Sequence, residues 1–387
     1  MRAMGNIISY VKTNGAQSFK DIPLGCVDSL VLSELAYNKY EGRVSGDMRF
    51  DVTLRELNSH GAADSLFSTT RVPEQNRVLF ELAAESRRFS EIALGAYRAH
   101  SDEELEKQFA AITYRLDENL FYIAFRGTDG SFVGWKEDLN MAYQSPVPSQ
   151  TAALSYFEEL AAAYPEAMFI LGGHSKGGNI AEYAAACASD AAQSRVIAVY
   201  NHDGPGFRED ALNMERFNKI RGLIHKTIPE SSIIGPLLEQ YEQGHIIRSS
   251  AFIYLQHDPF SWLVENGDFV YSEQVSGFSL RAGKAIRIWL DETDEKTRQV
   301  FIGALYSAVS SSRADCYDEF CADFFGNTQL VIDAIKTEDP EIRQKVDETL
   351  QRLMLTLARE LRREIASKTA RLLSKPGLPQ IPWGLPR

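Results

Sequence analysis

The chain has 387 residues, of which 44% are hydrophobic and 24% are charged. This composition excludes a disordered chain and suits one large or two modest globular domains with a buried core. The 41 lysine and arginine residues are outnumbered by 53 aspartate and glutamate residues, which gives a net charge of −12. An acidic surface repels phosphate, so the charge argues against a general nucleic-acid-binding protein.

The N-terminal stretch MRAMGNIISYVKTNG lacks the uninterrupted apolar core of a signal peptide. No apolar run approaches the roughly 20 residues that span a bilayer, so we expect a cytoplasmic protein. The four cysteines, at positions 26, 187, 316 and 321, do not have the spacing of metal ligands. Since the sequence also has no nucleotide-binding fingerprint, it predicts neither a metal nor a cofactor.

Short β-rich runs alternate with helical patterns between about residues 105 and 260. The runs are FYIAF (121–125), MFIL (168–171), VIAVY (196–200) and AFIYL (251–255). Strands separated by helix-length segments are typical of a mainly parallel sheet. The stretch YRLDENLFYIAF (114–125) has turn residues in its middle and predicts an antiparallel strand pair that leads into this sheet.

The pattern changes at about residue 283, after which the sequence predicts helices only. The clearest helix begins near Asp339 and Pro340 and has apolar residues at steps of three and four up to Ile365. We expect an N-terminal extension (1–20), an α/β domain (21–282), a C-terminal helical segment (283–375) and a Pro-rich tail (376–387). Residues 207–250 are interpreted either as a cap over the site or as ordinary connecting helices.

The stretch GGHSKGG (172–178) sets one serine, Ser175, between a predicted strand and a predicted helix. Gly173 and Gly177 complete the pattern G-x-S-x-G of a nucleophile elbow, where small residues are needed because the sharp turn brings strand and helix close together. The alternative is a glycine-rich turn with an incidental serine, but the phosphate-loop pattern G-x-x-x-x-G-K-[ST] is absent. The sequence therefore predicts that Ser175 is a nucleophile.

A serine hydroxyl is a weak nucleophile unless a base takes its proton. We expect this base to be a histidine at a strand end later in the chain. His257 is the best placed, because AFIYLQHDPFSW puts it just after the last predicted strand. His202 and His245 remain as alternatives, whereas His225 lies in a β-like run and His174 lies in the elbow itself and is expected to point elsewhere.

A third group, a carboxylate, must orient the imidazole of the base. Asp203, in AVYNHDGPGF, follows the strand after the elbow helix and would lie at the sheet edge where open α/β sheets have their active sites. It is also interpretable as a turn starter before Gly-Pro-Gly. Glu230, in TIPESS, is the alternative acid, and Asp258 is too close to His257 in sequence to orient it.

An oxyanion hole needs donors for the charge that develops on the carbonyl oxygen. One donor is the backbone N–H of Lys176, the residue after the nucleophile. A second donor is expected from a loop after an earlier strand, and Thr128 directly follows Arg126-Gly127 at the end of the FYIAF strand. Lys176 and Thr128 are therefore the predicted oxyanion hole.

Taken together, these motifs resemble the class 3 (fungal-type) lipases of the α/β-hydrolase superfamily. The resemblance rests on FYIAFRGTD followed by WKEDL, on GGHSKGG, on a strand ending in GPGF and on a histidine near a tryptophan. The runs IPLGCVDSLVLSELAY (22–37), IPESSIIG and QHDPFSW are more similar to an uncharacterised bacterial lipase-like branch. The resemblance covers about residues 20–275 and implies an α/β-hydrolase fold, with a mainly parallel sheet flanked by helices and an added C-terminal helical segment.

The resemblance also implies the roles of single residues. Ser175 and His257 would be nucleophile and base, and Trp135 and Asp138 would support the oxyanion loop. Class 3 lipases place their acid in an Asp-x-Val-Pro context after the next strand, where this chain reads KTIPESS. Because no aspartate stands there, we prefer Asp203 and keep Glu230 as the alternative.

The expected activity is hydrolysis of a carboxylic ester through an acyl-enzyme on Ser175. Transfer of the acyl group to an alcohol or amine is an alternative, and so is a non-catalytic protein on the same scaffold. The expected partner is a small ester or a lipid. The C-terminal helices leave open both oligomerisation and contact with a membrane surface.

Overall fold

The computed structural model describes residues 4–59, 64–68 and 70–311, together with single positions between 333 and 362. The Pro-rich tail lies outside the described residues, as does most of the helix predicted from Asp339 to Ile365. Among the described helices, none is long and apolar enough to cross a bilayer.

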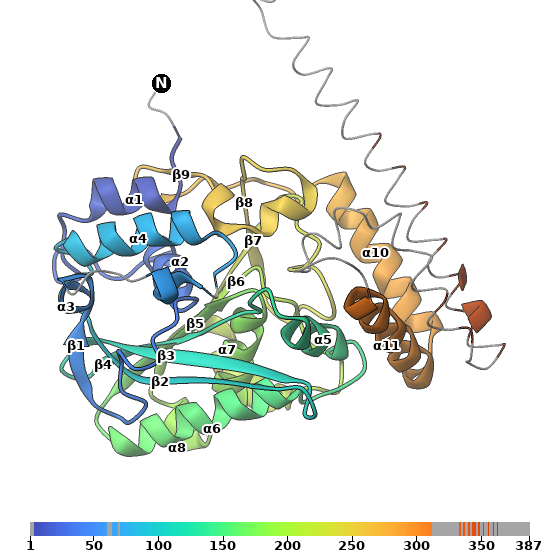
Figure 1. The fold of residues 1–387 in the computed structure, drawn as a ribbon, viewed down its shortest axis with the longest axis horizontal. Coiled ribbons are helices and arrows are strands. Elements are labelled where there is room, and N and C mark those ends of the chain that lie inside the picture. The colour runs from blue at the N-terminus through green and yellow to red at the C-terminus, as the bar shows by residue number, and fades with distance from the viewer. Residues whose placement is uncertain are drawn as a thin grey trace, which may run out of the picture.

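An eight-stranded sheet runs through the molecule, with its strands side by side in chain order (Figure 1). The strands are β1 (Phe50–Thr53), β2 (Ala93–Asp102), β3 (Lys107–Asp117), β4 (Leu120–Phe125), β5 (Met168–His174), β6 (Val196–His202), β7 (Ile224–Pro229) and β8 (Gly244–Ile247). Strands β1 to β4 pair antiparallel, whereas β4 to β8 pair parallel. The predicted antiparallel lead-in and three of the four predicted strands are therefore confirmed.

Helices cover both faces of this sheet. The helices are α1 (Ile7–Asn14), α2 (Cys26–Leu35), α3 (Leu54–Ser59), α4 (Pro73–Glu85), α5 (Phe132–Asn140), α6 (Pro148–Ala163), α7 (Lys176–Cys187), α8 (Asp190–Gln193), α9 (Met214–Ile220), α10 (Gly277–Glu292) and α11 (Glu295–Ser311). In Figure 1, α1, α2 and α4 lie on one side of the sheet, and α6, α7 and α8 lie on the other. Each layer buries its own apolar cluster against the sheet.

Helices α10 and α11 lie together at one end of the molecule, beside α5 (Figure 1). The side chain of Ser276 caps the start of α10 by accepting a hydrogen bond from the N–H of Ser279 at 3.2 Å. The ring of Trp289 in α10 lies against that of Phe301 in α11, with 5.0 Å between the ring centres. The hydroxyl of Ser279 also donates to the carbonyl oxygen of Ser232 at 2.5 Å, which attaches the start of α10 to the loop after β7.

The fourth predicted strand, residues 251–255, is wrong. The chain there forms a short 3-10 helix, η3 (Ile253–His257), followed by a second, η4 (Pro259–Ser261). The apolar residues of the run do not alternate between core and water, since Phe252 and Leu255 are both about half exposed. Contacts outside the run hold the helix instead: the indole N–H of Trp262 donates to the carbonyl oxygen of Gln256 at 2.7 Å.

The segment 207–250, interpreted above as a cap or as connecting helices, contains two strands of the sheet, β7 and β8. Between them lies a loop whose residues Ile234, Leu237 and Leu238 line the cavity described below. A small hairpin lies outside this sheet and consists of β9 (Val264–Glu265) and β10 (Asp268–Phe269). The N-terminal segment pairs with it through an antiparallel bridge between Gly5 and Val264. Residues 4–19 therefore pack on the sheet domain.

Candidate active site

Ser175 lies in the sharp turn between β5 and α7, with a φ of 58° and a ψ of −132°. A non-glycine residue rarely adopts this backbone conformation. A Cβ on Gly173 would lie 2.3 Å from the carbonyl carbon of Gly177, and one on Gly177 would lie 2.1 Å from the carbonyl oxygen of Phe125. The predicted need for glycine at both positions follows from these contacts. A mainly parallel sheet flanked by helices, with this turn after β5, is the α/β-hydrolase fold.

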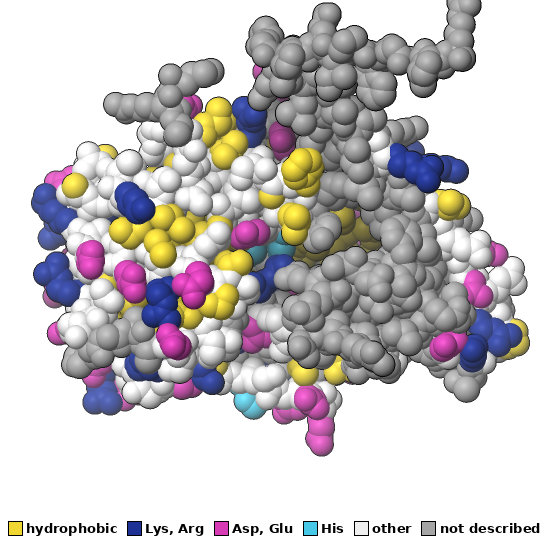
Figure 2. All heavy atoms as spheres, turned by 45° about the horizontal axis from the view of Figure 1, so that its top comes forward, with side chains coloured by type: hydrophobic (Ala, Val, Ile, Leu, Met, Phe, Trp, Pro, Cys, Tyr) yellow, Lys and Arg dark blue, Asp and Glu magenta, His cyan; other side chains and the backbone are white. Residues whose placement is uncertain are grey.

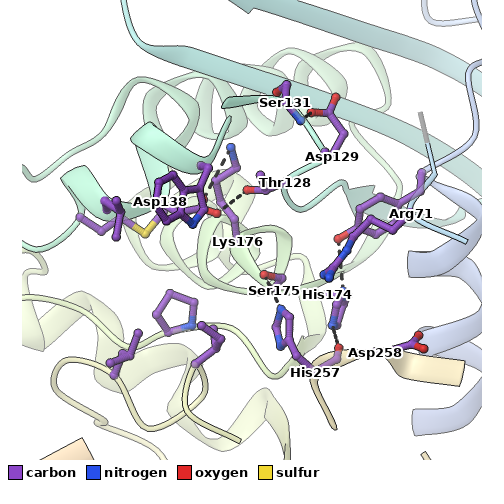
Figure 3. A pocket seen from close by; sticks show the side chains of 18 of the residues that line it. Arg71, Thr128, Asp129, Ser131, Asp138, His174, Ser175, Lys176, His257 and Asp258 are labelled. Atoms are coloured by element: carbon purple, nitrogen blue, oxygen red, sulfur yellow. Dashed lines mark hydrogen bonds and ion pairs between the residues drawn. The ribbon is translucent and has the colours of Figure 1, made fainter. Parts of the chain in front are cut away.

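His257 lies at the end of η3 and faces Ser175 (Figure 3). Its Nε2 is 2.9 Å from Oγ of Ser175, and its Nδ1 is 2.7 Å from Oδ2 of Asp203. The structure thus brings together the serine, the histidine and the preferred acid of the sequence analysis. The backbone next to Asp203 also holds the turn of Ser175, because the N–H of Ser175 donates to the carbonyl oxygen of His202 at 2.9 Å.

Asp203 directly follows β6 and is fully buried. Its carboxylate accepts hydrogen bonds from the hydroxyl of Ser232 at 2.6 and 2.8 Å and from the N–H of Gly235 at 3.1 Å. Burial raises the pKa of Asp203 above its ordinary value, and the bonds from Ser232 and Gly235 oppose that shift. Sequence reasoning missed Ser232 and Gly235, because nothing local marks them as partners of Asp203.

Glu230, the alternative acid, has a different environment. It directly follows β7 and begins a turn, where its backbone N–H donates to the carbonyl oxygen of Ile247 and its carbonyl oxygen accepts from the N–H of Ser276. The carboxylate that the structure sets against Nδ1 of His257 is that of Asp203. Asp258 instead caps η4, since its Oδ1 accepts from the N–H of Phe260 at 3.0 Å.

Most of the other histidines have structural partners. His202 is fully buried between the hydroxyls of Ser29 and Thr227, and burial lowers its pKa to about 3. His225 stacks on Tyr200, and His245 is exposed on β8. His60 lies outside the described residues. His174, which precedes Ser175 in the elbow, has its Nε2 2.9 Å from the carbonyl oxygen of His257.

The loop after β4 lies directly over the elbow. A Cβ on Gly127 would lie 3.2 Å from Cβ of Ser175, so the backbone of this loop is close to the nucleophile. The next residue, Thr128, donates its hydroxyl to Oδ2 of Asp138 in α5 at 2.5 Å (Figure 3). Burial raises the pKa of Asp138 to about 6, while the nearby charge of Lys176 lowers it.

A cavity of about 950 Å³ opens onto Ser175 and His257. On the face shown in Figure 2, histidine side chains are visible among hydrophobic and basic ones. One side of the cavity is apolar and consists of residues from the loop after β7 and from the C-terminal helices, including Leu237, Leu238, Ile286, Trp289, Phe301 and Ile302. The other side is polar and includes Glu34, Thr70, Arg71, Asn76 and Asp258. The site therefore suits a ligand with one apolar and one polar part.

Comparison with known proteins gives one family match. A family model described as Mbeg1-like matches residues 83–307, which is more than half of the chain. The match includes β2 to β8, α10, and α11 as far as residue 307. No curated protein matches the sequence.

Three similar solved structures are fungal lipases. A fungal lipase-inhibitor complex is 15% identical, with a TM-score of 0.38, over 73% of this chain and 98% of that one. Lipase II from Rhizopus niveus is 11% identical, with a TM-score of 0.36, over 70% and 90%. The Rhizomucor miehei lipase propeptide complex is 17% identical, with a TM-score of 0.30, over 44% of this chain and 66% of that one, just under two thirds.

Proposed function

The chain belongs to the Mbeg1-like family, and from the geometry of its site we propose that it is a serine hydrolase that cleaves carboxylic esters. One observation carries this proposal: the hydrogen-bonded chain from Oγ of Ser175 through His257 to Asp203, at the carboxyl edge of the parallel strands. Active sites of open α/β sheets lie at this edge. The strained turn of Ser175 supports the same role, since strain of this kind gathers at functional sites.

In the proposed reaction, Oγ of Ser175 attacks the carbonyl carbon of the ester while Nε2 of His257 takes its proton. The Nδ1–H of His257 donates to Asp203, which holds the ring in place and stabilises the imidazolium. His257 then gives the proton to the alcohol oxygen as the C–O bond breaks, leaving an acyl group on Ser175. A water molecule then attacks the carbonyl carbon of this acyl-enzyme and loses a proton to Nε2 of His257. As the bond from this carbon to Oγ breaks, His257 gives the proton to Oγ, which releases the acid and restores the serine.

We assign the two donors that bind the oxyanion to the loop after β4 and to the start of α7. The backbone N–H of Lys176 is one donor, as in other nucleophile elbows. The hydroxyl of Thr128 donates to Asp138, so the second donor is the backbone N–H of Thr128. Trp135 and Asp138, on α5, would support this loop. Preorganised donors of this kind account for about 10² to 10³ in turnover each.

The shape of the cavity supports an ester whose acyl chain is apolar and whose alcohol is small and polar. The acyl chain would lie along Leu237 and the C-terminal helices, where burial of each methylene contributes about 0.8 kcal/mol. The alcohol would leave toward the side of Thr70 and Asn76. A small ester or a lipid therefore remains the proposed substrate.

The test is labelling with a fluorophosphonate, read by intact mass, together with hydrolysis of nitrophenyl esters of increasing chain length. We expect one adduct on the wild type, no adduct on Ser175→Ala, and turnover that depends on chain length. Asp203→Asn is expected to lower kcat by about 10⁴, because the neutral amide favours the wrong tautomer of the histidine.

Glu230→Gln is the matched control, since it neutralises the alternative acid in the same way. If Glu230→Gln abolishes turnover and Asp203→Asn does not, the acid is assigned wrongly. Absence of both adduct and turnover at every chain length in the wild type would favour a non-catalytic protein on this fold.

A further inference from the structure

A buried cation directly follows the nucleophile, and its charge has no part in the reaction proposed above. The side chain of Lys176 is only 1% exposed. Its Nζ donates to the backbone oxygen of Gln108 at 2.8 Å, to the side-chain oxygen of Gln108 at 2.9 Å and to Oε2 of Glu137 at 2.9 Å. An ammonium group has three donors, so each of them has a partner.

Glu137, the anionic partner of this lysine, joins several elements. It lies fully buried in α5. Its Oε2 also accepts from the N–H of Gln108 on β3 at 3.0 Å, and its Oε1 accepts from the N–H of Ser149 at the start of α6 at 2.7 Å. Hydrogen bonds to a charged group are stronger than those between neutral groups. The pair of Lys176 and Glu137 therefore ties the elbow to α5, β3 and α6.

The neighbour of Glu137 extends this connection to the proposed oxyanion loop. Asp138 accepts from the hydroxyl of Thr128, and its Oδ1 lies 3.8 Å from Nζ of Lys176. The start of α5 is packed tightly, since a Cβ on Gly134 would lie 2.6 Å from Oε1 of Gln108 and 2.9 Å from Cγ2 of Thr128. The ammonium, both carboxylates and Thr128 thus form one packed unit beside Ser175.

We propose that the side chain of Lys176 is a positioning residue, which holds Thr128 and the start of α5 in place relative to Ser175. The inference rests on the proposed function, because it takes this loop as the oxyanion hole. A displacement of about 1 Å in an active site costs about 10²-fold in rate. A side chain that fixes the loop against the nucleophile's turn therefore controls turnover without touching the substrate.

The variant that tests this inference combines Lys176→Met with Glu137→Gln. Methionine keeps much of the length of the lysine stem, and glutamine keeps the shape of glutamate, so no unpaired charge stays buried. The matched control combines Arg88→Met with Asp28→Asn. This second pair has a 2.6 Å contact, and its side chains are 2% and 1% exposed.

Hydrogen exchange, read by mass spectrometry, reports on the loop without reference to activity. We expect faster exchange in peptides that span residues 126–139 in the Lys176→Met, Glu137→Gln variant, and no change there in the control. Unchanged exchange in these peptides overturns the inference, whether or not the wild type hydrolyses esters. If the double variant does not fold, Lys176→Met alone is the second variant, because the Glu137 carboxylate then still accepts from the N–H groups of Gln108 and Ser149. We expect faster exchange in the same peptides, and unchanged exchange likewise overturns the inference.

Turnover gives a second measurement. We expect kcat of the double variant to fall about 10²-fold while KM stays within about threefold, with slower fluorophosphonate labelling of Ser175. A kcat equal to that of the control overturns the inference. A wild type that neither labels nor hydrolyses any ester contradicts the proposed function instead, and hydrogen exchange alone then decides whether Lys176 positions the loop.

Discussion

The ring of His174 lies against the ring of His257, with 4.6 Å between the ring centres, and its Nε2 is 2.9 Å from the carbonyl oxygen of His257. Burial and the neighbouring His257 hold the pKa of His174 well below its ordinary value, so the ring is neutral. A neutral imidazole has one N–H. We assign it to Nε2, which leaves Nδ1 to accept from the hydroxyl of Tyr37 at 3.2 Å. His174 therefore binds the backbone of the residue that we propose as the base.

His174→Phe keeps a ring beside His257 but removes this hydrogen bond. Because one hydrogen bond contributes about 0.5 to 1.5 kcal/mol, we expect kcat to fall about twofold to tenfold, with little change in KM. Steady-state hydrolysis of a nitrophenyl ester measures both kcat and KM. Tyr37→Phe is the control, since it removes a hydroxyl from the other side of the same ring and is expected to change kcat less. Equal kcat for the wild type and His174→Phe would contradict the role of the bond.

Stability should depend on pH through Glu34, which is 5% exposed on α2. Burial, and then the charge of Asp258, raise the pKa of Glu34 from 4.5 to about 8. Between these values the unfolded chain loses a proton that the folded chain keeps, so the stabilisation present below pH 4.5 is lost as pH rises toward 8. Glu34→Gln keeps the shape and does not titrate.

We therefore expect Glu34→Gln to become more stable relative to the wild type by about 2 to 4 kcal/mol between pH 5 and pH 8, since one pKa unit corresponds to about 1.4 kcal/mol. Urea unfolding at several pH values gives this difference. A difference that stays constant over this range would show that Glu34 is ionised in the folded protein.

Part of this site was predictable because its causes are local. Gly173 and Gly177 each lie two positions from Ser175, and the steric need for glycine acts within one turn. The choice between Asp203 and Glu230 was not local, since Ser232 and Gly235, which donate to Asp203, are 29 and 32 residues away from it.

Other features of the site depend on packing that no short pattern shows. The run AFIYL has the composition of a strand, but contacts with later residues make it a 3-10 helix. A lysine at the start of α7 is expected on the surface, and its burial depends on Glu137, 39 residues earlier. The sequence predicts helices after residue 283, but this pattern does not indicate that Trp289 and Phe301 line the cavity.

The apolar side of the cavity should set the length of the acyl chain. Leu237→Trp places a larger side chain in that wall, so long acyl chains would lose room while an acetyl group would not. We expect kcat/KM for a dodecanoyl ester to fall at least about tenfold relative to the acetyl ester, because misfit by one methylene costs about 1 to 3 kcal/mol. Leu280→Trp is the control, because Leu280 is 61% exposed on α10. Equal chain-length profiles for the two variants would exclude this wall as the acyl site.

The conformation of Ser175 should cost stability. With a φ of 58° and a ψ of −132°, its backbone lies in a region that glycine adopts readily and that costs other residues about 1 to 3 kcal/mol. Glycine lowers the free energy of unfolding by about 0.4 to 1 kcal/mol relative to alanine, because it gives the unfolded chain more conformational freedom. We therefore expect Ser175→Gly to be about 1 kcal/mol more stable than Ser175→Ala, although neither variant has a nucleophile. Urea unfolding of both variants measures the difference.

Ser155, which is exposed within α6, supplies the control for this comparison. There the backbone is helical, so Ser155→Gly is expected to be about 1 kcal/mol less stable than Ser155→Ala. The sign of the difference between glycine and alanine should thus reverse between the two serines. If the glycine variant is less stable than the alanine variant at both positions, the backbone of Ser175 is not strained. The conformation of the elbow then has no cost in folding free energy.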